Sequence, residues 1–249
     1  LEFLIAFRYL RSKKTEGFIS IIAGFSLVGI ILGVATLIIV MSVMNGFRAE
    51  LIGRILGLNG HIGIYENQNN FLNYDEFSVG VAEIPGVKAV TPQIEGQGLI
   101  VYNNNSSGIV VRGVRWSDLS ARKQLWNSIG NKEIESFNNN GIIIGHRLAK
   151  KLNIQNNDDV FILTPQLRVT AFGSVPKQKK FKVIQTFDVG MFEYDSSFVF
   201  MSLADAQSLY GYDKNNTISN LEVYLNSTDD IALIKNKLVE ISDKNFIIT

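Results

Sequence analysis

The chain has 249 residues, with 24 basic and 23 acidic side chains, so its formal net charge is only +1. This balance excludes the strongly basic composition that is typical of nucleic-acid-binding proteins. The sequence contains no cysteine, which excludes disulfides and thiolate-ligated metal sites. Bulk composition therefore excludes several functions without indicating one.

The first segment, residues 1–17, has apolar residues at helical spacing and basic residues around them. The apolar residues are Phe3, Leu4, Phe7 and Leu10. This pattern is typical of an amphipathic helix that lies on a membrane surface. Because several basic residues of this segment precede a long apolar run, we expect the segment on the cytoplasmic side.

Residues 18–47 predict a transmembrane helix. No acidic or basic residue occurs from Gly17 to Phe47, and spanning a bilayer takes about 20 apolar residues. A cleaved signal peptide would have a shorter apolar region of about 7 to 15 residues and a small-residue cleavage site, and neither fits. A buried helix of a soluble protein is a weaker alternative at this length. The predicted orientation places residues 59–249 outside the cytoplasm, which is the periplasm in a bacterium with two membranes.

Apolar residues continue at helical spacing beyond the predicted span. They are Val40, Met44, Phe47, Leu51, Ile55 and Leu58. Since charged residues lie between them, we expect the helix to continue as an amphipathic stalk to about residue 58. Two interpretations remain open. This face packs against the outer domain, or it forms one wall of an apolar cavity near the outer leaflet.

Residues 59–249 predict an α+β domain. Two βαβ-like units are expected near its ends, because a helical pattern separates two strand patterns in each. The first has strands at 61–66 and 87–93 around a helix at 74–84, and the second has strands at 221–225 and 246–248 around a helix that starts near Ser227 or Thr228. We expect these units, residues 59–100 and 214–249, to form one subdomain.

The stretch between these units, residues 101–213, is rich in strand patterns and predicts an inserted β-rich subdomain. The strands expected in and beside it are 98–102, 108–114, 142–144, 160–163, 181–187 and 197–201. No phosphate-binding loop, zinc-protease motif, nucleophile elbow or EF-hand occurs, so neither catalysis nor a metal or cofactor is expected. His61 and His146 are isolated in the sequence, and each is more typical of a surface or capping residue than of a metal ligand.

The segment 165–176, PQLRVTAFGSVP, is unusual for a connection between two strands. Hairpin loops commonly have two to five polar residues, whereas this segment is longer and mainly apolar. One interpretation is burial against the domain, and the other is an exposed hairpin that docks a partner. A basic group follows at 177–180.

Three stretches of the sequence match a known pattern. They are SVMNGF at 42–47 with ILGL at 55–58, IAFRYLRSKK at 5–14, and IIIGHRLAKKLNI at 142–154. In that order, they resemble the signature of the first helix, the N-terminal segment and part of the outer domain of the permeases of lipoprotein-releasing ABC transporters, the LolC/LolE family. The following turn departs from the family, with Asp158 and Asp159 where Gly-Asp is usual.

The resemblance implies a fold and a function. The outer domain would be of the macrolide-exporter permease type, with a porter-like subdomain and an inserted β-rich one. The chain begins at Leu1 without Met and is expected to be a fragment, with three further transmembrane helices after Thr249. The implied function is extraction of lipoproteins from the outer leaflet of the inner membrane and their transfer to a periplasmic chaperone.

The resemblance also implies partners and site residues. The partners are a separate ABC ATPase, a second permease subunit, acylated lipoprotein cargo, membrane lipid and the chaperone. The segment 165–176 matches the position of the hook that holds the chaperone, and Gln178 and Lys179 match the polar pad beside it. The expected chaperone-binding residues are therefore Pro165, Leu167, Arg168, Val169, Phe172, Pro176, Gln178 and Lys179. The stalk residues expected to hold acyl chains are Val40, Val43, Met44, Phe47 and Leu51.

Two alternatives remain. The first is a related permease that transmits force instead of moving lipid, in macrolide efflux or cell division, and it differs in whether segment 165–176 binds a lipoprotein carrier. The second is a membrane-tethered sensor or enzyme, which the missing catalytic motifs disfavour.

Overall fold

The computed structural model describes residues 17–66, 71, 73–130, 135–170, 173–241 and 246–249. The chain divides into two units, Leu1–Gly53 and Arg54–Thr249. The amphipathic segment expected at residues 1–17 lies, except for Gly17, outside the described residues. The first unit is therefore described only as a helix.

Helix α2, Gly17–Leu56, is continuous over 40 residues. Its segment Ile21–Gly53 is long and apolar enough to cross a membrane, and none of its most apolar window is buried within the structure. A helix that is apolar on every side and uncovered is suited to lipid. Length and composition thus agree with the predicted span, and the helix ends at Leu56, two residues before the expected end of the stalk.

The strands near the two ends of the second unit form one part of its sheet. Strand β8 (Asn220–Leu225) lies between β1 (Ile62–Glu66) and the first part of β2 (Val87–Tyr102) and is antiparallel to both. Strand β9 (Phe246–Ile248) pairs with β1 on its other edge. Since β1 and β2 are both antiparallel to β8, they run parallel to each other, as a βαβ unit requires.

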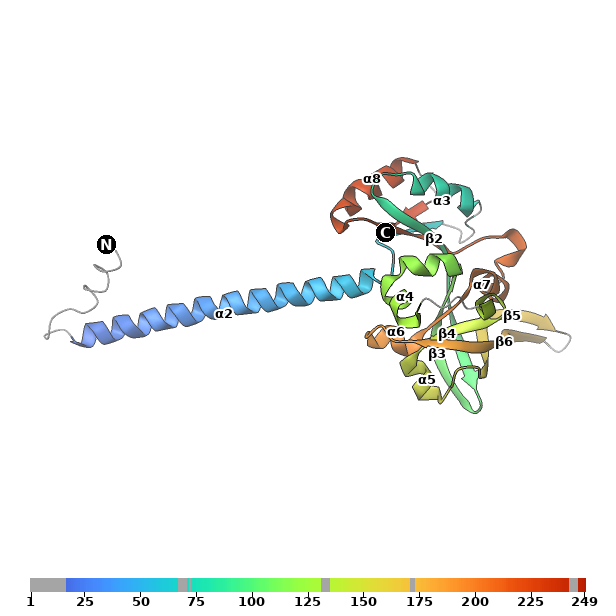
Figure 1. Ribbon diagram of the computed structural model, residues 1–249, viewed down its shortest axis with the longest axis horizontal. Helices are drawn as coiled ribbons and strands as arrows, with labels where there is room; N and C mark the ends of the chain where they lie inside the picture. Colours follow the sequence, from blue (N-terminus) through green and yellow to red (C-terminus); the bar gives the residue numbers. More distant parts are fainter. Residues whose placement is uncertain (1–16, 67–70, 72, 131–134, 171–172, 242–245) are drawn as a thin grey trace. The chain divides into compact units, whose positions relative to one another are not determined.

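Two helices cover this part of the sheet (Figure 1). Helix α3 (Tyr74–Ala82) contributes Val81 to the larger apolar core, and helix α8 (Ile231–Ile241) contributes Ile234 and Leu238. Both helices lie at the positions that the sequence patterns predict, so both expected helices are confirmed.

The remaining strands form a closed ring of six. They are β3 (Asn105–Val114), β4 (Gly141–Gly145), β5 (Asp159–Thr170), β6 (Gly173–Phe187) and β7 (Phe198–Ser202), together with the second part of β2. The pairings run β2–β3–β7–β4–β6–β5 and return to β2. Closure leaves these strands without free edges where the ring is complete.

Helices pack on this ring and divide its apolar side chains between two clusters. Ile142 and Ile144 of β4 join the larger core, while Ile143 joins a second cluster with Phe200 and Leu125. Neighbouring residues of β4 therefore face opposite sides, as the strand period of two requires. The helical elements are η1 (Trp116–Ala121), α4 (Lys123–Ile129), η2 (Glu135–Asn138), α5 (His146–Leu152), α6 (Phe192–Ser197), α7 (Leu203–Tyr210), η3 (Asp213–Asn215) and η4 (Thr228–Asp230).

One expectation about strands is wrong. The strands expected at 87–93 and 98–102 are a single strand, β2, which pairs with β8 in its first part and with β3 and β5 in its second. Gly96, which lies between the two expected strands, and Gly98, which begins the second, both allow close packing in β2. The Tyr210 ring lies against Gly96, and a Cβ atom on Gly98 would come within 2.8 Å of the Leu163 carbonyl oxygen. Because β2 belongs to both parts of the sheet, the division into two subdomains stays a prediction.

A candidate docking hairpin and an exposed apolar helix

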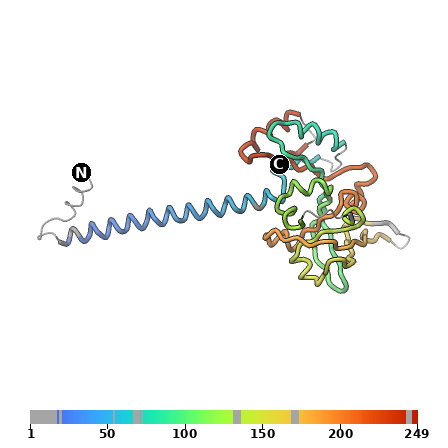
Figure 2. The backbone as a smooth tube through the Cα atoms, viewed as in Figure 1, coloured from blue at the N-terminus to red at the C-terminus, as the bar shows by residue number. Residues whose placement is uncertain are grey.

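The segment expected to be a long loop is mostly strand. Strands β5 and β6 pair from Asp159 with Lys182 to Thr170 with Gly173, with one irregularity between Thr164 and Leu167. The pairing of β5 with β2 ends at Leu163. Beyond it the two strands extend away from the rest of the sheet as a hairpin (Figure 2). Apolar and β-branched residues such as Val175 favour this extended backbone over an irregular loop.

Apolar side chains of this hairpin are exposed. Leu167 is 64% exposed and Val175 45% exposed, and Pro165 and Pro176 are exposed as well. Leu167 lies directly opposite Pro176 in the strand register. Because these four residues are exposed, the interpretation that the segment is buried against the domain does not hold for them.

The other expected hook residues are placed only in part. Arg168 lies opposite Val175 and Val169 opposite Ser174. Phe172 lies outside the described residues. The structure thus places the backbone of the hook but leaves its tip undescribed.

The base of the hairpin is fastened to helix α7. The Gln166 side-chain amide donates to the Tyr210 carbonyl, and the Lys177 ammonium donates to the Ser208 carbonyl. Lys179 Nζ lies 2.8 Å from Asp205 Oδ1. Lys177 and Lys179 are two residues apart on one strand, so they share the face that meets α7.

The two residues of the expected polar pad consequently differ. Gln178 points to the opposite face and is exposed, so its amide is accessible to a partner. Lys179 is partly covered, and its charge is paired with Asp205. Both residues were expected to contact the chaperone, and no local sequence pattern indicates the Lys179–Asp205 pair because Asp205 is distant in the chain.

A groove of about 900 Å³ runs along the base of the hairpin. It is lined by Leu163, Gln166, Leu167, Val175, Pro176, Lys177, Gln178, Gly211, Asp213 and Lys214. Sequence analysis missed the contribution of Gly211, Asp213 and Lys214, since no local motif connects them to the hairpin. Burial raises the pKa of nearby Tyr210, whose hydroxyl donates to the Gln97 carbonyl at 3.1 Å and so stays protonated.

The five expected acyl-binding residues are all exposed on α2. They are Val40, Val43, Met44, Phe47 and Leu51. Their separations of three and four residues place them on one face of the helix. Leu58, which sequence analysis added to the same face, is fully buried in the second apolar cluster. For Leu58 the packing interpretation is therefore correct.

A polar network holds Asn59, just after the end of α2. The Asn59 amide donates to the Ile55 carbonyl at 3.2 Å and to the Tyr194 hydroxyl at 2.6 Å. Arg112 Nη1 donates to Asn59 Oδ1 at 2.6 Å, and Arg112 Nε donates to Glu95 at 2.9 Å. Burial alone would lower the pKa of the Arg112 guanidinium, but nearby carboxylates, Glu95 among them, raise it. Arg112 is therefore a permanent cation between the helix end and the sheet.

A second arginine, Arg122, is fully buried in the domain. Arg122 Nη2 donates to Glu222 at 2.8 Å and to Gln93 at 2.7 Å. The Tyr224 hydroxyl donates to the same Glu222 oxygen at 2.8 Å, and burial raises the pKa of Tyr224. A buried charge pair needs such additional hydrogen bonds to offset its desolvation.

Comparison with known proteins matches most of the chain to one protein family. Residues 23–241 match the family model described as the MacB-like periplasmic core domain. The lipoprotein-releasing system transmembrane protein LolC of Neisseria meningitidis serogroup B is 34% identical over 222 residues, which are 86% of this chain and 52% of the relative. The lipoprotein-releasing system transmembrane protein LolE of Haemophilus influenzae is 27% identical over 84% of this chain and 51% of the relative. The chain spans about half the length of these curated relatives.

Two solved structures are also similar. The periplasmic region of MacB from Actinobacillus actinomycetemcomitans has a TM-score of 0.49 and 14% identity, over 78% of this chain and 91% of that one. The extracellular domain of the noncanonic ABC-type transporter YknZ from Gram-positive bacteria has a TM-score of 0.48 and 16% identity, over 76% of this chain and 98% of that one.

Proposed function

Because the chain belongs to the family of proteins with a MacB-like periplasmic core domain, we propose that it acts in an ABC permease subunit that releases lipoproteins from the inner membrane. The similarity to proteins named LolC, at 34% identity over 86% of this chain, supports this proposal most directly. In this proposal α2 crosses the inner membrane and residues 59–249 lie in the periplasm. The complete permease crosses the membrane several times.

The free energy of lipid extraction explains why such a subunit needs an ATPase. Each buried CH₂ group contributes about 0.8 kcal/mol, so one acyl chain of ordinary length costs about 10 kcal/mol to withdraw from lipid. We propose that a separate ATPase subunit supplies this energy and collapses an apolar cavity between two permease subunits. The exposed face of α2 from Val40 to Leu51 forms part of the cavity wall and contacts the acyl chains.

The β5–β6 hairpin is the proposed docking element for the periplasmic chaperone that accepts the lipoprotein. It presents Leu167 and Val175 to solvent on strands whose base is fastened to α7. Exposed apolar side chains on a held backbone suit docking, because little conformational entropy is lost when a partner binds. Gln178 offers an accessible amide beside them.

A permease that only transmits force, in macrolide efflux or cell division, is the second candidate. It shares the fold but has no lipoprotein carrier to bind. The exposed apolar residues of the hairpin favour lipoprotein release over this alternative.

Capture of the chaperone by the full-length permease in detergent tests the proposal. In the test variant, Leu167→Asp and Val175→Asp place two charges on the hairpin. In the matched control, Leu233→Asp and Val239→Asp change two residues of α8 that are 58% and 57% exposed. We expect at least tenfold weaker capture with the hairpin variant and unchanged capture with the control. Equal capture by both variants would contradict docking at the hairpin.

A further inference from the structure

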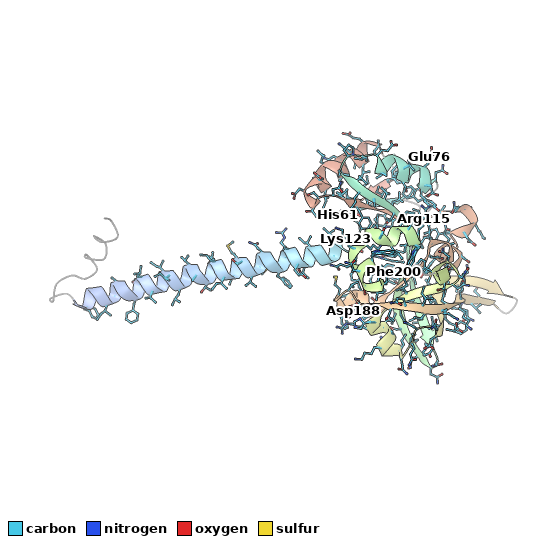
Figure 3. The ribbon with its side chains drawn as sticks, in the orientation of Figure 1. His61, Glu76, Arg115, Lys123, Asp188 and Phe200 are labelled. Atoms are coloured by element: carbon cyan, nitrogen blue, oxygen red, sulfur yellow. The ribbon has the colours of Figure 1, made fainter. Side chains whose placement is uncertain are left out.

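Three side chains with metal-binding atoms meet at a site that the proposed function does not use. His146 is the first residue of α5, Asp188 follows β6, and Asp195 lies in α6. His146 Nδ1 is 3.5 Å from Asp188 Oδ2 and 3.9 Å from Asp195 Oδ2. One ligand atom from each of the three lies within 4.8 Å of the others. Asp188 is labelled in Figure 3.

Two buried atoms of this cluster have no hydrogen-bond partner among the described residues. The Asp195 side chain is fully buried, and its Oδ2 is one of these atoms. His146 Nδ1 is the other. A carboxylate oxygen that is buried without a partner costs free energy, and it is directed at an imidazole nitrogen that is also unpaired. A bound cation would supply the partner that both atoms lack among the described residues.

Surrounding backbone groups hold the ligands in place. The Val189 amide donates to Asp195 Oδ1 at 2.9 Å, which leaves Oδ2 directed at the cluster. The Gly190 amide donates to Asp188 Oδ1 at 3.0 Å. The Asp195 backbone packs so closely against Gly145 that a Cβ atom there would overlap it. Such contacts orient ligands before a metal binds.

We propose that His146, Asp188 and Asp195 form a binding site for a divalent transition-metal ion, with Zn²⁺ as the best match. Zinc binds imidazole nitrogen and carboxylate oxygen at about 2.0 to 2.2 Å, so ligand atoms around a tetrahedral ion lie about 3.4 Å apart. The histidine-to-carboxylate distances of 3.5 and 3.9 Å need only a small contraction. Two carboxylates also neutralise the charge of the ion.

The ligand set separates Zn²⁺ from the common hard cations. Ca²⁺ and Mg²⁺ prefer sites made only of oxygen atoms, whereas an imidazole suits zinc. Asp188 is 60% exposed, which leaves a path for the ion and room for water as a fourth ligand. A bound ion would cross-link the connection between β6 and α6 to the start of α5. This inference does not depend on the proposed function.

Zinc titration of the full chain tests the site. The protein is purified in detergent with a tag that contains no histidine, stripped with a chelator, and titrated with ZnCl₂, MgCl₂ or CaCl₂ in a calorimeter. We expect one Zn²⁺ per chain and no saturable heat with the other two ions. We also expect Zn²⁺ at 100 times its Kd to raise the melting temperature by about 5 °C or more.

Single substitutions localise the ion. Asp188→Asn changes an exposed residue, so the fold should tolerate it. We expect Asp188→Asn and His146→Gln, each made alone, to weaken zinc binding at least tenfold. Glu193→Gln removes an exposed acid from the same helix as Asp195 and should bind zinc like the parent protein. His61→Gln tests the other histidine in the same way. The proposal is overturned if the parent protein binds no zinc, or if Asp188→Asn and His146→Gln bind it with unchanged affinity.

Discussion

Lys179 of strand β6 and Asp205 of helix α7 form an ion pair, with 2.8 Å between Nζ and Oδ1. Asp205 also accepts from the Ser202 hydroxyl at 2.7 Å, and its backbone amide donates to that hydroxyl at 3.1 Å. The ion pair therefore joins the base of the hairpin to the N-terminal cap of α7. A residue that was expected to contact the chaperone has a structural partner inside the domain.

Substitution of Lys179 should lower the stability of the domain. We expect Lys179→Met to reduce the free energy of unfolding by about 1 kcal/mol, because Asp205 is mostly buried and would lose a charged partner. Lys180→Met is the matched control, since Lys180 pairs with Asp159 on the exposed face. Thermal unfolding in detergent measures both variants. Equal destabilisation by the two variants would show that the Lys179–Asp205 pair contributes no more to stability than the exposed Lys180–Asp159 pair.

The buried Arg122–Glu222 pair should respond strongly to loss of one partner. Among the described residues, Arg122→Met leaves the buried Glu222 carboxylate with the Tyr224 hydroxyl as its remaining hydrogen-bond donor, so we expect a loss of about 3 kcal/mol. The double variant Arg122→Met with Glu222→Gln removes both charges and should recover at least half of that loss. A double-mutant cycle by thermal unfolding measures the coupling. Simple additivity of the two single changes would contradict a coupled pair.

The stability of the domain should depend on the protonation of His61. Burial, and to a smaller extent the charge of Lys88, lowers the pKa of His61 below its usual 6.5. The neutral imidazole accepts from the Leu225 amide at 3.2 Å. Because the unfolded chain binds this proton more readily, the contribution of His61 is complete above pH 6.5 and is lost as pH falls through the lowered pKa.

Melting temperatures at pH 7.5 and pH 5.5 check this dependence. His61→Asn keeps an acceptor for the Leu225 amide but does not titrate, so we expect it to lose less stability on acidification than the parent protein. Identical losses in the two proteins would show that other groups cause the pH dependence.

The face of α2 can be tested near the end of the apolar run. Phe47 belongs to the proposed cavity wall, whereas Ala49 lies about 200° around the helix at nearly the same depth. We expect Phe47→Asp to reduce lipoprotein release from spheroplasts at least tenfold and to leave chaperone capture unchanged. Ala49→Asp should retain release, because it introduces the same charge on the opposite face. Equal release by both variants would remove this face from the mechanism.

The elements that sequence analysis predicted correctly carry their signal locally. Helix α2 is marked by an uncharged run that is longer than a bilayer requires, and helices α3 and α8 are marked by the helical spacing of their apolar residues. The six-stranded ring was not predictable, because the parallel pairings of β3 with β7 and of β4 with β6 join distant segments. The strands expected at 87–93 and 98–102 are one strand, and the glycine between them, Gly96, packs against the ring of Tyr210, which is distant in the sequence.

The same limit applies to the candidate sites. The hairpin was recognisable because its apolar residues gather within one short segment of the sequence, residues 165–176. The Lys179–Asp205 pair and the meeting of His146 with Asp188 and Asp195 depend on tertiary packing of separate elements. Polar partners that lie far apart in the chain leave no periodic pattern, so the sequence supplied no signal for them.

Pro165 and Pro176 have a consequence for the colloidal behaviour of the protein. Past Leu163 the strands of the hairpin pair with each other, and their outer edges lie beyond the closed ring. Exposed strand edges beside apolar side chains are templates for intermolecular sheet growth. A proline has no amide hydrogen to offer an added strand. The two prolines therefore let the hairpin display apolar side chains while discouraging polymerisation of one molecule onto the next.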